Sequence, residues 1–264
     1  MVNFVKVLSL LAVAGVSLAA PQSSSGSSPS ATQSATSSGS SSSSSTSSSS
    51  SAPSSSSSSS SGGKSGGGSV TVTVQNKCSH GLHVYKLDNG NTGSPDNQDV
   101  GAGSSHDFQV DGGWSGRFWG CEDGKSGCSD YGSAVSLAEF QFSGWGGKDF
   151  YDISFVDGFN LPMSISPEGK SGSGYDCGAP KCASLPKCPK GLEGENGACK
   201  SACAAYGTPE YCCTGQYNSP DKCKASSLAK TFKDGCPDAY SYAYDDAKST
   251  FACSSKKYTV VFCP

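Results

Sequence analysis

Long hydrophobic runs are scarce in this sequence, and the one that is present lies close to its start. Residues 7–18 form an apolar stretch that is too short to cross a membrane as a helix. The stretch follows a lysine, and Ser17 and Ala19 provide the small residues that a signal peptidase reads. This pattern predicts a secretory signal peptide over residues 1–19, cleaved after Ala19, and therefore an exported protein.

Charged and aromatic side chains are almost missing from residues 21–69. This segment contains 30 serines and 3 threonines among 49 residues, with Lys64 as its only charge. Because it can bury too little apolar surface to offset the entropy of ordering, it is predicted to be a disordered tether. Its density of hydroxyl groups is also typical of an O-glycosylated stalk. We therefore expect a signal peptide at residues 1–19, a serine-rich linker at residues 20–69 and a folded domain at residues 70–264.

The folded domain lacks an excess of basic residues. Residues 70–264 carry 17 lysine and arginine residues against 22 aspartate and glutamate residues. A mildly acidic surface argues against nucleic acid or an anionic membrane as a partner. No membrane span is expected either, because long apolar runs are missing. The sequence has no N-x-S/T site, so N-glycosylation is not expected either.

Metal-binding cysteine motifs are also absent, although the domain holds all 14 cysteines. Zinc is the competing interpretation for the closely spaced Cys177, Cys182 and Cys188. No CxxC pair occurs, and the three histidines lie far from these cysteines in sequence, which argues against a zinc site. An even number of cysteines after a signal peptide instead predicts seven disulfides formed in an oxidising compartment. We expect no metal and no cofactor.

Period-two alternation predicts β-structure in the first half of the domain. Val70, Val72 and Val74 alternate with polar residues, as in a half-buried strand. Further short strands, separated by clusters of Gly, Asn, Asp and Ser, are predicted at residues 82–87, 106–110, 117–120, 138–142 and 150–156. Several short strands of this kind favour a mainly β sandwich or barrel.

The second half of the domain is rich in cysteine and has few periodic runs. Ten cysteines fall within residues 175–253, where periodic runs are few, so we expect a loop-rich lobe held by disulfides with one helix near residues 226–233. Strand character returns at residues 258–263. Because this strand ends at Cys263, we predict a bridge to Cys78, the only cysteine near the amino end of the domain.

Several blocks of sequence, taken in their order along the chain, resemble the thaumatin-like proteins. The blocks are Gly116-Arg117-Phe118-Trp119-Gly120-Cys121, Leu137-Ala138-Glu139-Phe140, Tyr151-Asp152-Ile153-Ser154, Asp157-Gly158-Phe159-Asn160-Leu161-Pro162-Met163, Glu210-Tyr211-Cys212-Cys213, Cys236-Pro237-Asp238-Ala239-Tyr240-Ser241-Tyr242 and Val260-Val261-Phe262-Cys263-Pro264. The resemblance covers residues 70–264 and implies a thaumatin-like β-sandwich, a disulfide-rich lobe and a cleft between them. The linker and signal peptide suggest a fungal secreted member.

The resemblance also implies how the cysteines pair. The implied pairs are Cys78–Cys263, Cys177–Cys253, Cys182–Cys236, Cys188–Cys199, Cys203–Cys212 and Cys213–Cys223, which leaves Cys121 with Cys128. Plant members typically have one more bridge in this last region, where the present sequence has a shortened loop. This difference from the plant members, a shorter loop with one bridge fewer, affects the loop beside Arg117.

Many members of this family line the cleft with one arginine, one glutamate and three aspartates. Matched motif by motif, these are Arg117, Glu139, Asp152, Asp157 and either Asp245 or Asp246. Arg117 is the only arginine in the chain, against 18 lysines, and its planar fork suits carboxylate or saccharide oxygens. Structural roles stay open: a carboxylate clamp for Arg117, a turn at Asp157-Gly158 and a solvent-facing strand position for Glu139.

Clustered carboxylates can hydrolyse a glycan or only bind it. For hydrolysis, we assign Glu139 as the acid and Asp157 as its catalytic partner. For binding, Arg117, Asp152, Asp245 and Asp246 contact the sugar hydroxyls while aromatic rings stack on the sugars. The aromatic candidates are Trp114, Trp119, Trp145, Phe159 and Tyr244, although an aromatic residue in such a fold is more often part of the core. The family is known for binding β-1,3-glucan, and some members have weak endo-glucanase activity.

The resemblance therefore predicts a secreted, cell-wall-associated monomer that binds β-1,3-glucan. Weak endo-β-1,3-glucanase activity is an additional option. The predicted role is wall remodelling during growth or germination. One alternative is a surface adhesin for host cell or matrix proteins, whose binding should survive neutralisation of Glu139 and Asp157. The other is a defence protein that permeabilises membranes or inhibits enzymes. The lack of a basic surface or an amphipathic apolar helix argues against permeabilisation.

Overall fold

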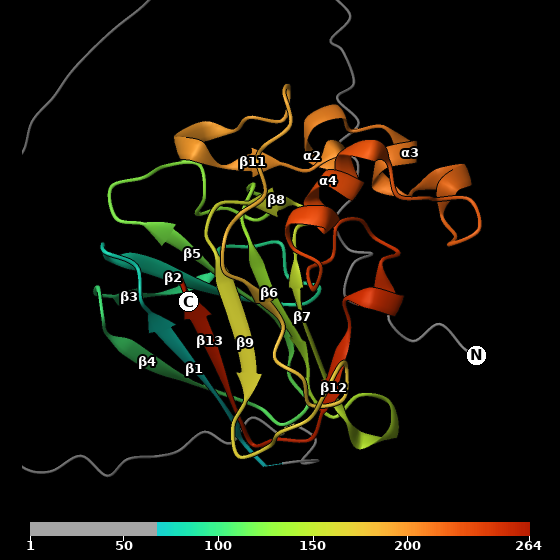
Figure 1. Cartoon of the computed structure of the whole chain (residues 1–264). Coiled ribbons are helices and arrows are strands. Elements are labelled where there is room, and N and C mark those ends of the chain that lie inside the picture. Colours follow the sequence, from blue (N-terminus) through green and yellow to red (C-terminus); the bar gives the residue numbers. More distant parts are fainter. Residues whose placement is uncertain (1–67) are drawn as a thin grey trace, which may run out of the picture. The chain divides into compact units, whose positions relative to one another are not determined.

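Two β-sheets packed face to face and a helical lobe beside them make up residues 68–264, the part of the chain that the computed structural model describes (Figure 1). The predicted signal peptide at residues 1–19 lies outside the described residues, as does all but the last two residues of the predicted linker at 20–69. The folded domain predicted at residues 70–264 lies within them.

The smaller sheet of the sandwich has five strands. In spatial order they are β10 (Lys181–Cys182), β9 (Met163–Pro167), β13 (Lys257–Phe262), β1 (Val70–Asn76) and β4 (Ser105–Val110). The first and last long strands of the domain, β1 and β13, run parallel in the centre of this sheet. The valines of the predicted alternation in β1 are buried, because they face the second sheet.

The larger sheet has six antiparallel strands. In spatial order they are β12 (Phe251–Cys253), β7 (Asp149–Ser154), β6 (Leu137–Gln141), β5 (Ser115–Glu122), β2 (Leu82–Asp88) and β3 (Asp96–Val100). The predicted strands in this region are confirmed to within a few residues at their ends. Strands β3, β9, β10 and β12 were not predicted, nor was the separate pair of short strands β8 (Gly158–Phe159) and β11 (Cys199–Lys200).

An aromatic cluster fills the space between the two sheets. The ring of Tyr258 in β13 lies within 5.6 Å, between centroids, of the rings of Phe140, Phe142 and Tyr151 from the larger sheet. Asp149 supports this cluster, since its carboxylate accepts a 2.7 Å hydrogen bond from the Tyr258 hydroxyl. Burying each such side chain contributes about 1.5–3 kcal/mol, so this cluster is a main source of stability.

The lobe consists of short helices and very short strands. They are β8 (Gly158–Phe159), β11 (Cys199–Lys200), α2 (Ala202–Tyr206), α3 (Pro209–Cys212) and α4 (Ser227–Gly235), with 3₁₀ turns η2 (Glu195–Gly197), η3 (Gly215–Tyr217) and η4 (Asp246–Lys248); a further turn, η1 (Trp145–Gly147), precedes β7. The helix predicted near residues 226–233 is α4. It begins where the Ser226 hydroxyl accepts a 3.1 Å hydrogen bond from the amide of Ala229, and it buries Phe232 against Phe159.

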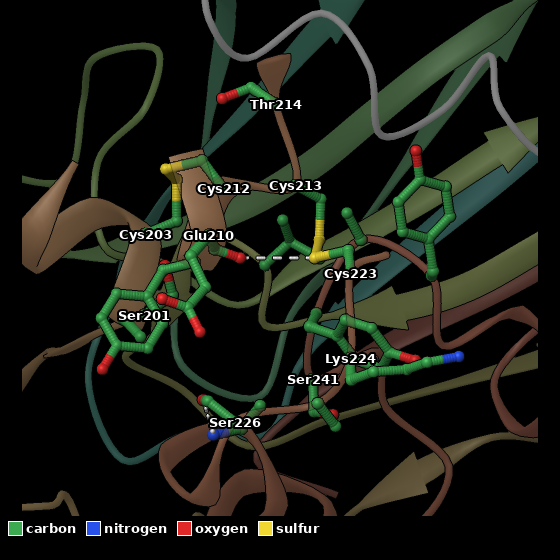
Figure 2. Close-up of a pocket in the computed structure, with 18 of the residues that line it drawn as sticks. Ser201, Cys203, Glu210, Cys212, Cys213, Thr214, Cys223, Lys224, Ser226 and Ser241 are labelled. Carbon is green, nitrogen blue, oxygen red and sulfur yellow. Dashed lines mark hydrogen bonds between the residues drawn. A yellow bond between two sulfur atoms is a disulfide. The ribbon is translucent and has the colours of Figure 1, made fainter. Parts of the chain in front are cut away.

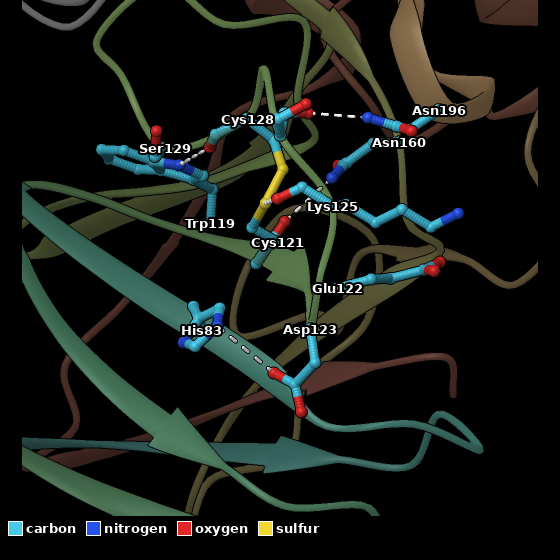
Figure 3. Close-up of a disulfide and its surroundings, with 12 residues drawn as sticks. His83, Trp119, Cys121, Glu122, Asp123, Lys125, Cys128, Ser129, Asn160 and Asn196 are labelled. Atoms are coloured by element: carbon cyan, nitrogen blue, oxygen red, sulfur yellow. Dashed lines mark hydrogen bonds and ion pairs between the residues drawn. A yellow bond between two sulfur atoms is a disulfide. The ribbon is translucent and has the colours of Figure 1, made fainter.

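Seven disulfides hold the domain together. Their cysteines are paired as the resemblance implies: Cys78–Cys263, Cys121–Cys128, Cys177–Cys253, Cys182–Cys236, Cys188–Cys199, Cys203–Cys212 and Cys213–Cys223. The Cα atoms of Cys78 and Cys263 are 5.1 Å apart, so the bridge predicted from the terminal strand is confirmed. Figure 3 shows the short Cys121–Cys128 loop, where the indole of Trp119 donates a 2.8 Å hydrogen bond to the Cys128 carbonyl.

Within residues 68–264, no helix has the length and apolar character that a membrane span needs.

Candidate functional site

Three charged side chains lie in one row across the larger sheet. Arg117 in β5 is directly opposite Glu139 in β6, which is directly opposite Asp152 in β7. Residues in such register share one face of a sheet, and here it is the face opposite the aromatic cluster. All three are buried, with exposed fractions of 8%, 4% and 2%. The interpretation of Glu139 as a solvent-facing residue is therefore wrong, because the lobe covers this face of the sheet.

Arg117 reaches from this row toward the lobe. Its Nη1 lies 3.8 Å from Oδ2 of Asp157, and its guanidinium carbon lies 4.8 Å from the centre of the Tyr131 ring. Both contacts are of the kind that a planar, delocalised cation makes. Among the described residues, Nε of Arg117 and Oδ1 of Asp152 are buried without a hydrogen-bond partner. The clamp interpretation of Arg117 is thus confirmed for one carboxylate, that of Asp157.

The buried carboxyls of this site are poor acids. Burial raises the pKa of Glu139 to about 7; the guanidinium of Arg117 opposes this rise, the carboxylate of Asp157 adds to it, and a hydrogen bond from Ser154 opposes it. Burial also raises the pKa of Asp152, helped by the charges of Glu139 and Asp246. The pKa of Asp157 is raised by burial against the opposing effect of Arg117. One guanidinium cannot balance this many carboxylates, so the site holds protons near neutral pH.

The two adjacent aspartates before and at the start of η4 have different partners. Asp245 accepts hydrogen bonds from the Ser241 amide and hydroxyl, at 3.1 and 2.9 Å, and lies 3.0 Å from Nζ of Lys233. Asp246 accepts a 2.9 Å hydrogen bond from the Tyr240 hydroxyl, and its charge acts on Asp152. Asp245 therefore holds the lobe together, while Asp246 belongs to the charged site.

A cavity of about 460 Å³ opens in the lobe next to this site (Figure 2). Its acidic lining residues include Asp157, Asp246 and Glu210, and three tyrosines line it as well: Tyr211, Tyr242 and Tyr244. Figure 2 shows that the Cys203–Cys212 and Cys213–Cys223 disulfides stand on either side of Glu210 in one wall, with Ser226 and Ser241 lower in the view. Two disulfides in one wall make the cavity rigid. Its size and its mixture of acceptors and aromatic rings suit a small polar ligand.

Asp157 connects the cavity with the charged row. It lines the cavity, and it also borders a small hollow that contains Arg117 and Tyr131. The turn interpretation of Asp157-Gly158 is confirmed as well, because the Gly158 amide donates a 3.1 Å hydrogen bond to the Phe155 carbonyl. Arg117, Glu139 and Asp152 do not line the cavity itself.

Similarity to known proteins extends over most of the chain. Residues 76–264 match the family model described as "Thaumatin family". The chain belongs to the thaumatin family. It is 42% identical over 224 residues to "Pathogenesis-related thaumatin-like protein 3.5" of Cryptomeria japonica, an alignment that covers 75% of this chain and 91% of that protein. It is 43% identical over 182 residues to "Glucan endo-1,3-beta-glucosidase" of Prunus avium, covering 57% and 72% of the two chains.

Among solved structures, the crystal structure of the protein elicitor MoHrip2 from Magnaporthe oryzae matches 74% of this chain and 99% of its own, with 10% sequence identity and a TM-score of 0.41.

The thaumatin-like domain brings most of the predicted site residues together. Arg117, Glu139 and Asp152 form the buried row, and Asp157 and Asp246 join it to the cavity. Asp245 lies outside the cavity lining and is occupied by Lys233 and Ser241.

The aromatic candidates are more scattered in the thaumatin-like domain. Trp119 and Phe159 are core residues with 2% exposure each, so the core interpretation is confirmed for these two candidates and they are not available to stack on a sugar. Trp114 packs on Phe118, and its indole donates to Asp88. Trp145 is 69% exposed and lies in η1. Of the five candidates only Tyr244 lines the cavity.

Sequence reasoning assigned no role to Glu210, Tyr211 or Tyr242, although all three line the cavity. Each stands in a block that resembles the family. Nothing in their spacing marks them as neighbours of Asp157, because the Cys203–Cys212 and Cys213–Cys223 disulfides and the fold of the lobe bring them together.

Proposed function

We propose that this thaumatin-like domain binds β-1,3-glucan in the cavity of the lobe. The observation that carries the proposal is that Asp157 and Asp246 share one cavity of about 460 Å³ with Tyr211, Tyr242 and Tyr244. Carboxylate oxygens accept hydrogen bonds from sugar hydroxyls, and the faces of tyrosine rings offer apolar surface to the C–H faces of sugar rings. The cavity therefore offers both kinds of contact that a neutral glycan needs.

The choice of β-1,3-glucan draws on the relative from Prunus avium whose name is a glucan endo-1,3-beta-glucosidase. A disulfide-rich member of the thaumatin family is consistent with secretion. We further propose that the protein is monomeric and associates with the cell wall, where it acts in wall remodelling. In this proposal the charged row of Arg117, Glu139 and Asp152 positions Asp157 and does not touch the glucan.

Hydrolysis is a second candidate function, favoured by the proton on Glu139. A pKa of about 7 leaves this carboxyl protonated in part near neutral pH, which is the state that a general acid needs. However, Glu139 is only 4% exposed, and the Arg117–Asp157 pair lies beside it. Because a catalytic acid must reach the glycosidic oxygen, turnover requires this pair to open, and we rank binding first.

The test measures retention of the full-length protein on insoluble β-1,3-glucan. The variant Asp157→Asn/Asp246→Asn should bind about tenfold more weakly or worse, because two acceptors of the cavity lose their charge. Asp234→Asn, which changes an exposed aspartate of α4, is the matched control and should bind as the parent does. Thermal unfolding of each variant shows whether the fold is kept. Parent protein that is not retained, or a double variant that is retained as well as the parent, contradicts the proposal.

The same tubes test hydrolysis through the release of reducing ends. Release by the parent, but not by Glu139→Gln, would assign the acid role to Glu139. Retention without release leaves a glucan-binding protein. If neither is seen, the adhesin and defence alternatives become the leading hypotheses, and their targets are protein surfaces or membranes.

A further inference from the structure

The cavity in the lobe is too small for a polysaccharide. A volume of about 460 Å³ lies in the range of about 300–1,000 Å³ that holds one drug-sized ligand, which corresponds to a few sugar rings. A longer chain bound there must leave across the rim of the cavity. The residues of the rim therefore decide whether further sugar rings add to binding.

One pair of aromatic rings continues from the cavity to the outer surface. Tyr211 in α3 lines the cavity, and its ring centre is 5.4 Å from that of Tyr206 in α2, with 37° between the ring planes. Tyr206 lies outside the cavity lining and is 48% exposed. The Cys203–Cys212 disulfide joins the two helices that carry these rings.

Gly191 leaves room beside the hydroxyl of the outer ring. The hydroxyl of Tyr206 lies 3.4 Å from the position that a β-carbon would take at Gly191, a residue with a φ of +92°. A larger residue at 191 would therefore contact the Tyr206 hydroxyl. Since Tyr206 packs on Tyr211 and the Cys203–Cys212 disulfide joins the helices that carry both rings, a ligand that stacks on Tyr206 loses little side-chain entropy.

We infer that Tyr206 and Tyr211 form a stacking subsite for the sugar rings of a glucan chain that extends out of the cavity. This inference rests on the proposed function and adds to it a preference for long chains. Tyr211 contacts sugar rings inside the cavity and at its rim, whereas Tyr206 contacts only sugar rings outside the cavity.

A saccharide fits this surface better than a protein partner does. Large hydrophobic side chains are exposed at only three places in residues 68–264, namely Trp145, Tyr175 and Tyr206, and only Tyr206 stacks on a residue of the cavity lining. A stable protein interface buries about 800 Å² on each partner around a cluster of anchoring side chains. A pair of rings next to acidic acceptors is instead what a sugar chain uses.

The experiment measures the affinity of the full-length protein for soluble β-1,3-linked glucose oligomers, from the trisaccharide to the heptasaccharide. For Tyr206→Ala we expect about three- to tenfold weaker binding of the heptasaccharide and unchanged binding of the trisaccharide. Tyr206→Phe keeps the ring and should bind both oligomers as the parent does. Tyr211→Ala should weaken the binding of both oligomers.

Tyr175→Ala is the matched control. Tyr175 is 46% exposed and also packs on one aromatic ring, that of Phe251, but it does not line the cavity. Its replacement should leave the affinity for both oligomers unchanged.

The outcomes separate the inference from the proposed function. If the parent binds neither oligomer, both are overturned. If the parent binds and Tyr206→Ala binds the heptasaccharide equally well, or loses affinity for both oligomers to the same degree, only the long-chain subsite is overturned. A loss confined to the longer oligomer and restored by Tyr206→Phe supports it.

Discussion

The guanidinium of Arg117 and the carboxylate of Asp157 lie 3.8 Å apart, and they join the larger sheet to the lobe. Arg117 belongs to β5, whereas the backbone carbonyl of Asp157 accepts a 3.3 Å hydrogen bond from the amide of Ser201 at the start of α2. The same carboxylate lines the cavity. The charge pair therefore couples the buried row of the sheet to the position of a side chain that we propose to touch glucan.

Removing the charge of Arg117 should destabilise the domain strongly. We expect Arg117→Met to lower the free energy of unfolding by about 3–5 kcal/mol near pH 7, because buried carboxylates lose their opposite charge. The loss should shrink near pH 4, where Glu139, whose pKa is raised to about 7, is protonated and needs no cation. Denaturant unfolding with the disulfides intact measures both values.

Arg117→Lys is the control for this prediction. It keeps the charge but loses the planar fork and the stacking on Tyr131, so we expect a smaller loss than for Arg117→Met. A loss of equal size at both pH values would show that packing, rather than charge, explains the effect.

The stability of the domain should fall as the pH rises from about 4.5 to about 7. The pKa of Glu139 is raised to about 7 in the folded state, whereas its ordinary value of 4.5 applies in the unfolded state. In this window the folded state binds more protons than the unfolded state, so the free energy of unfolding decreases with pH and levels off above about 7. Asp152 and Asp157, whose pKa values are also raised, act in the same direction.

Glu139→Gln tests which group causes this slope. A shift of this size corresponds to about 3 kcal/mol between the two ends of the window. The free energy of unfolding of the variant should therefore fall less than that of the parent between pH 4.5 and pH 7. Unfolding curves across this range measure the slope, and a profile unchanged by the substitution would mean that other groups hold the protons.

Much of the sandwich could be predicted from local patterns, whereas the lobe could not. The alternation in β1 and the cysteine at the end of β13 are local signals, and both led to correct elements. The edge strand β3 buries only Val100, so it carries no alternation that a pattern could reveal. Strands β8 and β11 have two residues each and exist because they pair with each other across the fold.

The candidate site shows the same limit at the level of single residues. Alternation correctly places Glu139 on the face opposite Phe140, but its burial depends on the lobe and has no local signal. Asp245 and Asp246 differ in their side-chain contacts, with Lys233 and Ser241 for Asp245 and with Tyr240 for Asp246, and no sequence pattern reveals these contacts. The family resemblance named the residues, and only the tertiary structure assigned each one its contacts.

The disulfides should differ in their contribution to stability according to the loop that each closes. Cys78–Cys263 joins residues 185 positions apart, whereas Cys121–Cys128 joins residues 7 positions apart. Loop-closure entropy predicts a loss of about 5 kcal/mol for Cys78→Ser/Cys263→Ser and about 2.5 kcal/mol for Cys121→Ser/Cys128→Ser. Calorimetry of the two double variants measures the difference. Equal losses would mean that local packing around Trp119 outweighs loop entropy.

Gly158 should be essential for the position of Asp157. Its φ is +132°, and a β-carbon at this position would lie 2.2 Å from the backbone oxygen of Cys199 in β11. Gly158→Ala must therefore strain the backbone and separate β8 from β11, and we expect a loss of at least about 2 kcal/mol in the free energy of unfolding together with weaker glucan retention.

The matched control is Gly169→Ala, at a glycine with a φ of +66° and no atom within 4 Å of the new methyl group. It carries the conformational cost of a positive φ without the clash, so its loss should stay near 1 kcal/mol, with glucan retention unchanged. Comparing the two variants isolates the contact with Cys199. If both lose the same stability and Gly158→Ala still binds glucan as the parent does, the β8–β11 contact does not fix Asp157, and its orientation comes from Arg117 alone.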